Sequence, residues 1–399
     1  MLNKIFLRFN SESLLGFSAI VGQGLRVGKF YLFHFAFLSS LKSFYKKYKN
    51  KQLKFNFHYV LLGGWPLISL LWSPNAKFGF IEAGQILLGL YFLLFNPDFK
   101  KLKDALILGV WMNLVLSLAE SFVLIRYPLS SIYFFKIHSP DIPSGFQWNS
   151  NNNAFFILVF SPIVMSFHRP LIKLLYLLFS SFVIYKANSK IIAGGWILFL
   201  FFSLIQEVIK NKKLVGIILI IFAFSAFFFI KVREDNTARA KKYSLILPSL
   251  KKFSLLLPDL VVKRFHGEEV VFDVHAEDSS LHERLLYVDG LSKVISEHTW
   301  FGIGAGGLQT IRHKQSYMDL YLTSPHFYFL EIWAKYGIFY LLEYLVLILI
   351  IWAKVFRKNK SVFLALSFFL VFNPVVSSVS YYLPKWVLYR LSLNEVEEE

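Results

Sequence analysis

Long apolar runs separated by short polar turns dominate this chain. A membrane-spanning helix needs roughly 20 apolar residues. The runs predict spans near 6–23, 28–43, 57–72, 77–95, 104–125, 152–167, 170–186, 190–208, 213–231, 328–353 and 361–375, with a short further span at 380–393. We therefore expect an all-α polytopic membrane protein with about 12 transmembrane helices.

One long polar stretch, residues 232–327, interrupts this pattern. It divides the chain into a first bundle of about nine spans (1–231), a large loop (232–327), and a last part with further spans and an acidic tail (328–399). A protein that only spans and packs has no need of such an insertion, so we expect the polar chemistry to lie there.

Composition agrees with a membrane protein. The hydrophobic fraction is 56% and the mean hydropathy is +0.52. Few soluble folds could bury that much apolar surface. The chain has no cysteine, which excludes disulfides and thiolate metal sites.

The net charge of +18 is distributed in a way that argues against nucleic-acid binding. Residues 231–327 hold 13 of the 43 Lys/Arg and 12 of the 25 Asp/Glu. The rest of the chain therefore holds 30 basic and 13 acidic residues. The excess lies in short basic clusters between apolar runs, as the positive-inside rule describes: Lys4/Arg8, Lys46/Lys47/Lys49, Lys100/Lys101, His168/Arg169 with Lys173, Lys210–Lys213 and Lys354–Lys360.

These clusters all fall on one side if the spans alternate from an inside, uncleaved N-terminus. The large loop and residues 126–151 are then outside the membrane. The end of the chain allows two interpretations. One helix over 361–383 gives eleven spans, whereas a turn from Asn373 to Ser380 gives twelve, with both ends of the chain inside.

Several segments of the large loop stand out. Residues 245–262 are apolar with interspersed lysines and prolines, which is typical either of an interfacial amphipathic segment or of packing within the loop. Residues 281–297 place Leu281, Leu285, Val288, Leu291 and Ile295 at helical spacing. Glu283, Arg284 and Asp289 lie off that stripe.

The glycine-rich run from Gly302 to Gly307 matches neither a Rossmann fingerprint nor a P-loop. It favours a plain turn, with an anion-binding loop as the alternative. The histidines of the large loop show no zinc-binding spacing. His326 differs from the others because it follows Ser324-Pro325 at the rim of an apolar run.

Polar and aromatic residues near the membrane have two interpretations each. Glu82 and Glu120 fall inside predicted spans, where a carboxylate is either functional or hydrogen-bonded between helices, and we favour the latter. Trp148, Trp300, Tyr317 and Tyr321 could stack on sugar rings or form the aromatic belt at the membrane interface.

The motifs occur in an order that resembles the O-antigen ligase and O-antigen polymerase superfamily of bacterial envelopes. The corresponding residues are Arg284 on a loop helix, Gly302/Gly304/Gly306, Ser324-Pro325-His326, Glu331 and Lys335 through Ile338, Gly145 to Asn151, Ser189-Lys190, Leu71 to Pro74, and Pro374 to Ser378. Lys190 stands where that family has arginine, and Ser150 stands where it has proline.

The resemblance implies a C-type glycosyltransferase fold and metal-independent, inverting transfer, with no cofactor. The donor would be an undecaprenyl-diphosphate-linked glycan and the acceptor a lipid A core or a saccharide, outside the inner membrane. His326 would be the catalytic residue, with Arg284 and, more weakly, Lys190 at the diphosphate. Gly302, Gly304, Gly306, Asn149, Asn151 and Tyr321 are the expected substrate-binding residues.

These residue types suit that chemistry. An acceptor hydroxyl needs a base near neutral pH, which histidine supplies. A departing diphosphate needs fixed cations. Arginine binds it bidentately, whereas lysine acts as a point charge.

The sequence does not separate a ligase from a repeat-unit polymerase. Alternatives from other classes are a transporter or flippase of lipid-linked glycans and a scaffold with the loop as its docking surface.

Overall fold

The computed structural model describes most of the apolar segments of the chain. The described residues are 11–21, 26–27, 30–53, 57–95, 97–123, 142–147, 149–167, 169–187, 189–210, 279–315, 318–321, 327–373 and 383–397. The predicted span at 213–231, the segment 245–262, and the residues Trp148, Tyr317 and His326 lie outside them.

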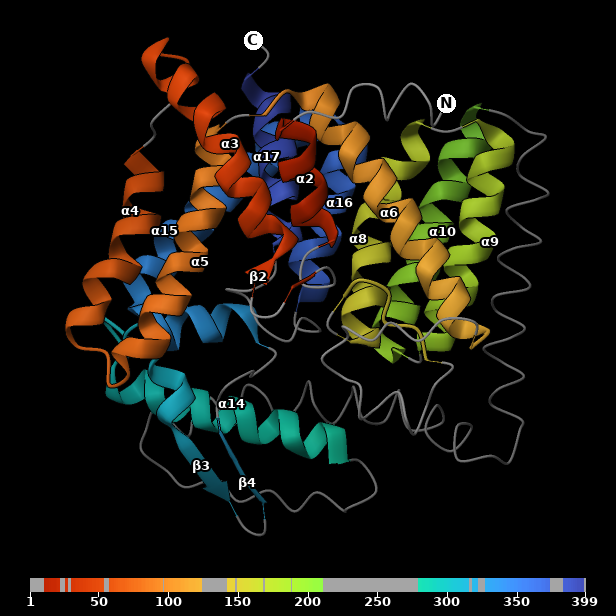
Figure 1. Ribbon diagram of the computed structural model, residues 1–399. Helices are drawn as coiled ribbons and strands as arrows, with labels where there is room; N and C mark the ends of the chain where they lie inside the picture. The colour runs from red at the N-terminus through yellow and green to blue at the C-terminus, as the bar shows by residue number, and fades with distance from the viewer. Residues whose placement is uncertain are drawn as a thin grey trace.

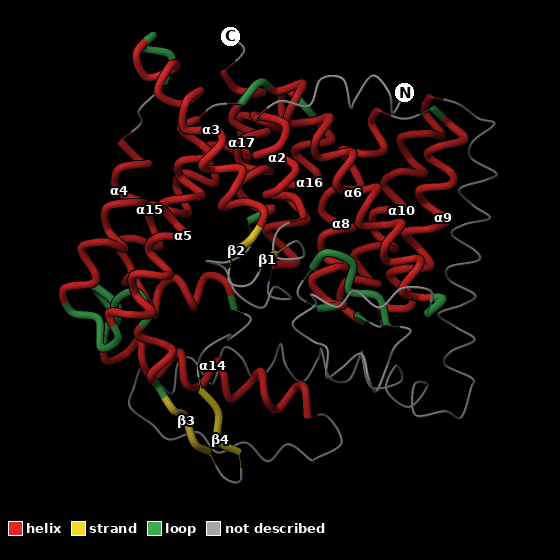
Figure 2. The backbone as a smooth tube through the Cα atoms, in the orientation of Figure 1, coloured by secondary structure: helices red, strands yellow, loops and turns green. Residues whose placement is uncertain are grey.

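The described part of the chain is almost entirely helical (Figures 1 and 2). Its α-helices are α2 (Ser11–Val21), α3 (Leu32–Lys49), α4 (Phe57–Ile68), α5 (Ala76–Phe95), α6 (Phe99–Ser121), α8 (Ser150–Phe167), α9 (Pro170–Ala187), α10 (Lys190–Lys210), α14 (Ser279–Glu297), α15 (Tyr328–Lys358), α16 (Lys360–Phe372) and α17 (Pro384–Glu397). Two short 3₁₀ turns, η1 (Ser69–Leu71) and η3 (Gly307–Thr310), extend this set.

Two short antiparallel hairpins are the departures from helix among these residues. The first joins β1 (Arg26–Val27) to β2 (Phe30–Tyr31). It occupies the start of the span expected at 28–43, so the helix there begins only at Leu32. The second joins β3 (Arg312–Gln315) to β4 (Met318–Tyr321), with Arg312 opposite Tyr321.

Helices of membrane-spanning character are present. In the described ranges, four are long and apolar enough to cross a bilayer: Ala76–Phe95, Lys100–Ser121, Pro170–Ala187 and Tyr328–Lys358. Shorter apolar helices cover Ser11–Val21, Phe57–Leu71, Ile191–Ser203 and Lys360–Phe372. The largely helical membrane architecture is therefore confirmed for the described residues, while the total of eleven or twelve spans stays a prediction.

The bundle packs around a large aromatic-rich core. α2 packs on α6 and α3, α16 packs on α8, and α17 packs on α15, α16 and α5. Phenylalanines fill much of the buried space, including Phe92, Phe95, Phe155, Phe156, Phe160 and Phe369. Rigid rings bury a large apolar area while losing few rotamers. α14 lies across one end of the bundle, beside the β3–β4 hairpin (Figure 1).

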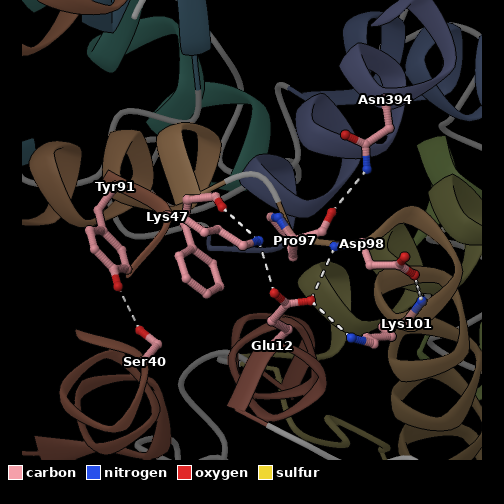
Figure 3. Close-up of polar contacts among 9 residues, drawn as sticks. Glu12, Ser40, Lys47, Tyr91, Pro97, Asp98, Lys101 and Asn394 are labelled. Carbon is pink, nitrogen blue, oxygen red and sulfur yellow. Dashed lines mark hydrogen bonds and ion pairs between the residues drawn. The ribbon is translucent and has the colours of Figure 1, made fainter. Parts of the chain in front are cut away.

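α2 begins at the opposite end of the bundle (Figure 1), where basic residues gather around Glu12 (Figure 3). The Glu12 carboxylate accepts from Lys47 Nζ at 2.8 Å and from Lys101 Nζ at 3.4 Å. Nearby, Asn394 Nδ2 on α17 donates to the Pro97 carbonyl at 3.2 Å. The start of α2 and the end of α17 thus lie at the same end of the bundle.

Candidate functional site

The glycine-rich run forms a tight turn between α14 and η3. Gly302, Gly304 and Gly306 have φ values of +67°, +91° and +74°, a region that other residues rarely adopt. The turn also lies against other backbone: a Cβ on Gly306 would clash with Gly79 at the start of α5. Glycine is therefore required both for the conformation and for the close approach.

α15 is broken where it passes this turn. Gly337 has φ +82° and ψ 174°, so the helix consists of two segments, 328–336 and 338–358, instead of the single continuous span expected at 328–353. Where a helix breaks, the carbonyl groups just before the break lose the N–H donors that a continuous helix provides four residues later. In an apolar environment those groups must be satisfied from elsewhere.

The glycine turn supplies the missing partners. Ile303 N–H donates to the Ala334 carbonyl at 2.9 Å, and Gly304 N–H donates to the Lys335 carbonyl at 2.8 Å. A third carbonyl, that of Tyr336, accepts from Trp65 Nε1 at 2.8 Å. The turn thus caps the first segment of α15. The glycine turn and the break at Gly337 therefore depend on each other.

Every backbone amide from residue 302 to residue 307 donates within the chain. Besides the two above, Gly302 donates to His298 O and Gly307 to Gly304 O. Ala305 donates to Ser69 Oγ and Gly306 to Glu82 Oε2, both at 3.0 Å. An anion could bind these amides only by displacing these partners. This geometry is that of a docked turn, and substrate binding by the three glycines stays a prediction.

Gly337→Ala is expected to destabilise the protein by at least about 1–3 kcal/mol, the cost of holding an ordinary residue in a glycine-only conformation. A Cβ there would also clash with the Trp300 carbonyl oxygen. The measurement is unfolding of the purified protein in a detergent titration. Gly64→Ala in α4 is the control, because a Cβ there meets no atom within 4 Å. Equal stability of the two variants would contradict a strained kink.

A buried ion cluster lies directly beneath the turn. Glu82 Oε1, on α5, is 2.9 Å from Lys335 Nζ and accepts from the Tyr336 hydroxyl at 2.8 Å. Lys335 Nζ also reaches Glu331 Oε1 at 2.6 Å, one helical turn earlier. The side chains of Glu82, Glu331 and Lys335 are at most 3% exposed. The expectation that Glu82 is hydrogen-bonded between helices is confirmed.

A cavity opens in the bend of α15, and we call it the kink pocket. Its interior is narrow, about 20 Å³, which is room for roughly one water-sized group. Its lining comes from α5, both segments of α15 and the start of α17: Ile86, Tyr328, Glu331, Ile332, Lys335, Tyr336, Tyr340, Tyr344, Lys385 and Trp386. It therefore joins the ion cluster to Lys385, a second buried ammonium group.

α14 packs on the first segment of α15 through the predicted apolar stripe. Leu291 and Ile295 are buried in a cluster with Leu308 and Ala334. Asp289, which lies off that stripe, is also fully buried. Val288, Leu291 and Ile295 of the predicted stripe are buried as expected, whereas the side chains of Leu281 and Leu285 lie outside the described part. The burial of Asp289 could not be read from the stripe.

The upstream segment forms a second polar cluster against α6. Ser144 N–H and Gly145 N–H donate to Glu120 Oε2 at 2.7 and 2.8 Å. Asn113 Oδ1 accepts from Phe146 N–H at 2.8 Å. The expected hydrogen bonding of Glu120 is therefore seen, with the loop amides of Ser144 and Gly145 as partners.

The predicted site residues are described to different extents. Asn149 Oδ1 accepts from Asn152 N–H at 2.7 Å and so caps the start of α8. Asn151 lies in the first turn of that helix, partly exposed. Arg284 is on α14, Lys190 begins α10 and Tyr321 ends β4, but their side chains lie outside the described part, as does the whole of His326.

Exposed aromatic residues cluster beside the turn. Trp300 is 60% exposed and stacks on Phe339, with ring centroids 5.6 Å apart. Phe301 stacks on Trp65 at 6.0 Å. Such a patch is typical of the membrane interface, so sugar stacking by Trp300 stays a prediction. The described residues include no group of three or more His, Asp or Glu placed to hold a metal ion.

The apolar bundle, the interrupted helix and the buried charges at its bend together define a multi-pass α-helical membrane protein with a polar site at one end. Residues 175–345 match the family model for O-antigen ligase. Over this segment the chain is similar to the O-antigen ligase family. A search of curated proteins found no match. The matched residues include α14, the glycine turn and most of α15.

Proposed function

We propose that the protein is a glycosyltransferase of the bacterial inner membrane that transfers a glycan from an undecaprenyl-diphosphate carrier to a lipid A core or another saccharide acceptor. Transfer takes place outside the membrane, is inverting and needs no metal or cofactor. The same chemistry serves a repeat-unit polymerase, which joins glycan units to each other. In this proposal, the large loop 232–327 is the working surface between the two sets of spans.

The observation that carries the proposal is the mutual docking of the glycine turn and the α15 kink. It fixes α14, which bears Arg284, against the short helical segment that begins at Tyr328, two residues after His326. Functional groups need such rigid support to be held in a productive geometry. The docking is at the end of the bundle opposite the basic cluster around Glu12, which agrees with an outer site.

In the proposed reaction, His326 accepts the proton of the attacking acceptor hydroxyl as the new glycosidic bond forms at the anomeric carbon. The bond from that carbon to the diphosphate breaks, and the carrier leaves as undecaprenyl diphosphate. Arg284 binds the departing diphosphate through its planar fork, and Lys190 adds a point charge. Such fixed cations stabilise the charge that develops in the transition state.

The experiment that tests the function is a gel profile of surface glycans in a deletion strain of the bacterium that encodes the protein. Loss of all attached chains supports a ligase, and a single attached repeat unit supports a polymerase. An unchanged profile would contradict both and would favour the transporter or scaffold interpretation.

Arg284→Ala is expected to lower transfer at least about tenfold, because a hydrogen bond to a charged group contributes about 1.5–3 kcal/mol. Arg284→Lys should restore only part of the activity, since it keeps the charge and loses the fork. The rate of glycan attachment in membranes is the readout. Lys293→Ala, which removes an exposed cation from the same helix, is the control and should have no effect.

A further inference from the structure

The kink pocket contains one donor and one acceptor whose hydrogen-bonding capacity is unused. In the described part of the chain, Trp386 Nε1 and Glu331 Oε2 are buried and have no hydrogen-bond partner. Both residues line the pocket. Unsatisfied buried polar groups are rare because each costs stability, so a pair of opposite kind in one cavity indicates a ligand.

The two groups are held in place by their surroundings. The other Glu331 oxygen is bound to Lys335 at 2.6 Å, which fixes the carboxylate. The Trp386 indole lies against the backbone of Gly89 on α5, where any Cβ would clash with the ring. The donor and the acceptor are therefore preorganised, which reduces the entropy lost on binding.

The pair has the hydrogen-bonding pattern of a hydroxyl group. A hydroxyl oxygen can accept from the indole N–H while its proton is donated to the carboxylate. An anion such as phosphate fits poorly, because it would face the lone pairs of Glu331. A free cation fits poorly as well, because Lys335 and Lys385 already bring two ammonium groups to the same lining.

The rest of the lining favours a sugar over a simple alcohol. Tyr328, Tyr336, Tyr340 and Tyr344 line the pocket together with Trp386, and aromatic edges of this kind pack against the C–H groups that flank a sugar hydroxyl. Lys385 Nζ is 4.9 Å from the centroid of the Trp386 ring. The narrow interior suits one hydroxyl or hydroxymethyl group at the edge of a pyranose.

We infer that the kink pocket is a saccharide subsite in which Glu331 and Trp386 bind one sugar hydroxyl. This inference rests on the proposed function and extends it. Tyr328 in the pocket wall is two residues along the chain from His326, the predicted base. The sugar belongs either to the lipid-linked donor or to the acceptor, and both have the hydroxyl chemistry that the pocket recognises.

The test is saturation-transfer difference NMR on the purified full-length protein in detergent, with glucose, galactose and N-acetylglucosamine as probes. Trp386→Phe keeps the aromatic ring and removes the N–H. We expect about a two- to tenfold loss of sugar affinity, the worth of one neutral hydrogen bond. Trp352→Phe is the matched control, because that indole donates to Ser367 Oγ at 2.9 Å, outside the pocket lining.

Stability provides a second readout. Without sugar, Trp386→Phe and Trp352→Phe lose the same ring volume, so Trp386→Phe should be the more stable of the two variants, because it removes an unpaired buried donor. Trp352→Phe should be less stable, because it loses a satisfied hydrogen bond. A folded Trp386→Phe variant with unchanged sugar signals would overturn the inference, as would the absence of any signal from the original chain.

The arms of the experiment separate the two sources of the sugar. Signals that persist with undecaprenyl diphosphate bound support an acceptor sugar, and signals that the carrier displaces support the donor glycan. Binding is measured without turnover, so this test is independent of the gel profile. Absent binding combined with lost surface glycan in the deletion strain would overturn the subsite and leave the proposed function intact.

Discussion

Replacing His326 with alanine is expected to abolish glycan attachment at the cell surface while protein level and membrane insertion stay normal. His326 is the residue proposed to take the proton of the attacking hydroxyl, and general-base catalysis typically contributes about 10²–10⁴-fold to a rate. A loss of this size leaves little product on a gel. The measurement is the surface-glycan profile of a deletion strain that carries the variant, with immunoblots of the membrane fraction.

His298→Ala is the matched control. His298 is an exposed histidine in the same large loop, at the end of α14, and its contact with the turn is made by the backbone carbonyl. An alanine there keeps that contact, so glycan attachment should be unchanged. Full activity of His326→Ala would contradict the assignment of the base, and equal loss in both variants would indicate damage to the loop instead.

Hydropathy and charge are sufficient to predict the helical membrane architecture because they are local properties. Apolar runs correspond to α5, α9 and α16 within a few residues. The amphipathic stripe of 281–297 likewise predicts α14 and its buried face. The β1–β2 hairpin was missed because β2 lies at the start of an apolar stretch whose length suits a helix, while β1 lies in the short linker before it.

The long-range contacts of the candidate site could not be predicted in this way. Glu82 and Gly306 are 224 residues apart in sequence, and nothing local indicates their hydrogen bond. Trp65 and Tyr336 are 271 residues apart. In contrast, the four-residue spacing of Glu331 and Lys335 is a recognisable signal for a helical ion pair. Sequence reasoning could have proposed that pair and did not.

The break at Gly337 illustrates why backbone conformation is hard to infer. A glycine within an apolar run is compatible with a continuous transmembrane helix. Its positive φ arises only because the turn at residues 302–306 supplies partners for the carbonyls that the break exposes. The kink is thus a property of two segments together, and neither segment encodes it alone.

Glu82→Ala is expected to lower the free energy of unfolding by about 3–5 kcal/mol, the usual cost of removing one partner from a buried ion pair. The carboxylate accepts from the Gly306 amide and the Tyr336 hydroxyl and pairs with Lys335, so its loss weakens both the turn and the kink. Detergent-titration unfolding of the purified protein is the measurement. Glu297→Ala, an exposed glutamate at the end of α14, should change stability by less than about 0.5 kcal/mol.

Two further variants separate the charge of Glu82 from its hydrogen bonds. Glu82→Gln keeps an oxygen that can accept from the Gly306 amide. Its free energy of unfolding should therefore lie between those of Glu82→Ala and the original chain. Lys335→Met combined with Glu82→Ala removes both charges of the pair, and the double variant should lose less stability than the sum of the single losses. Strictly additive losses would show that Glu82 and Lys335 act independently. In that case the ion cluster would not be what holds the glycine turn to α15.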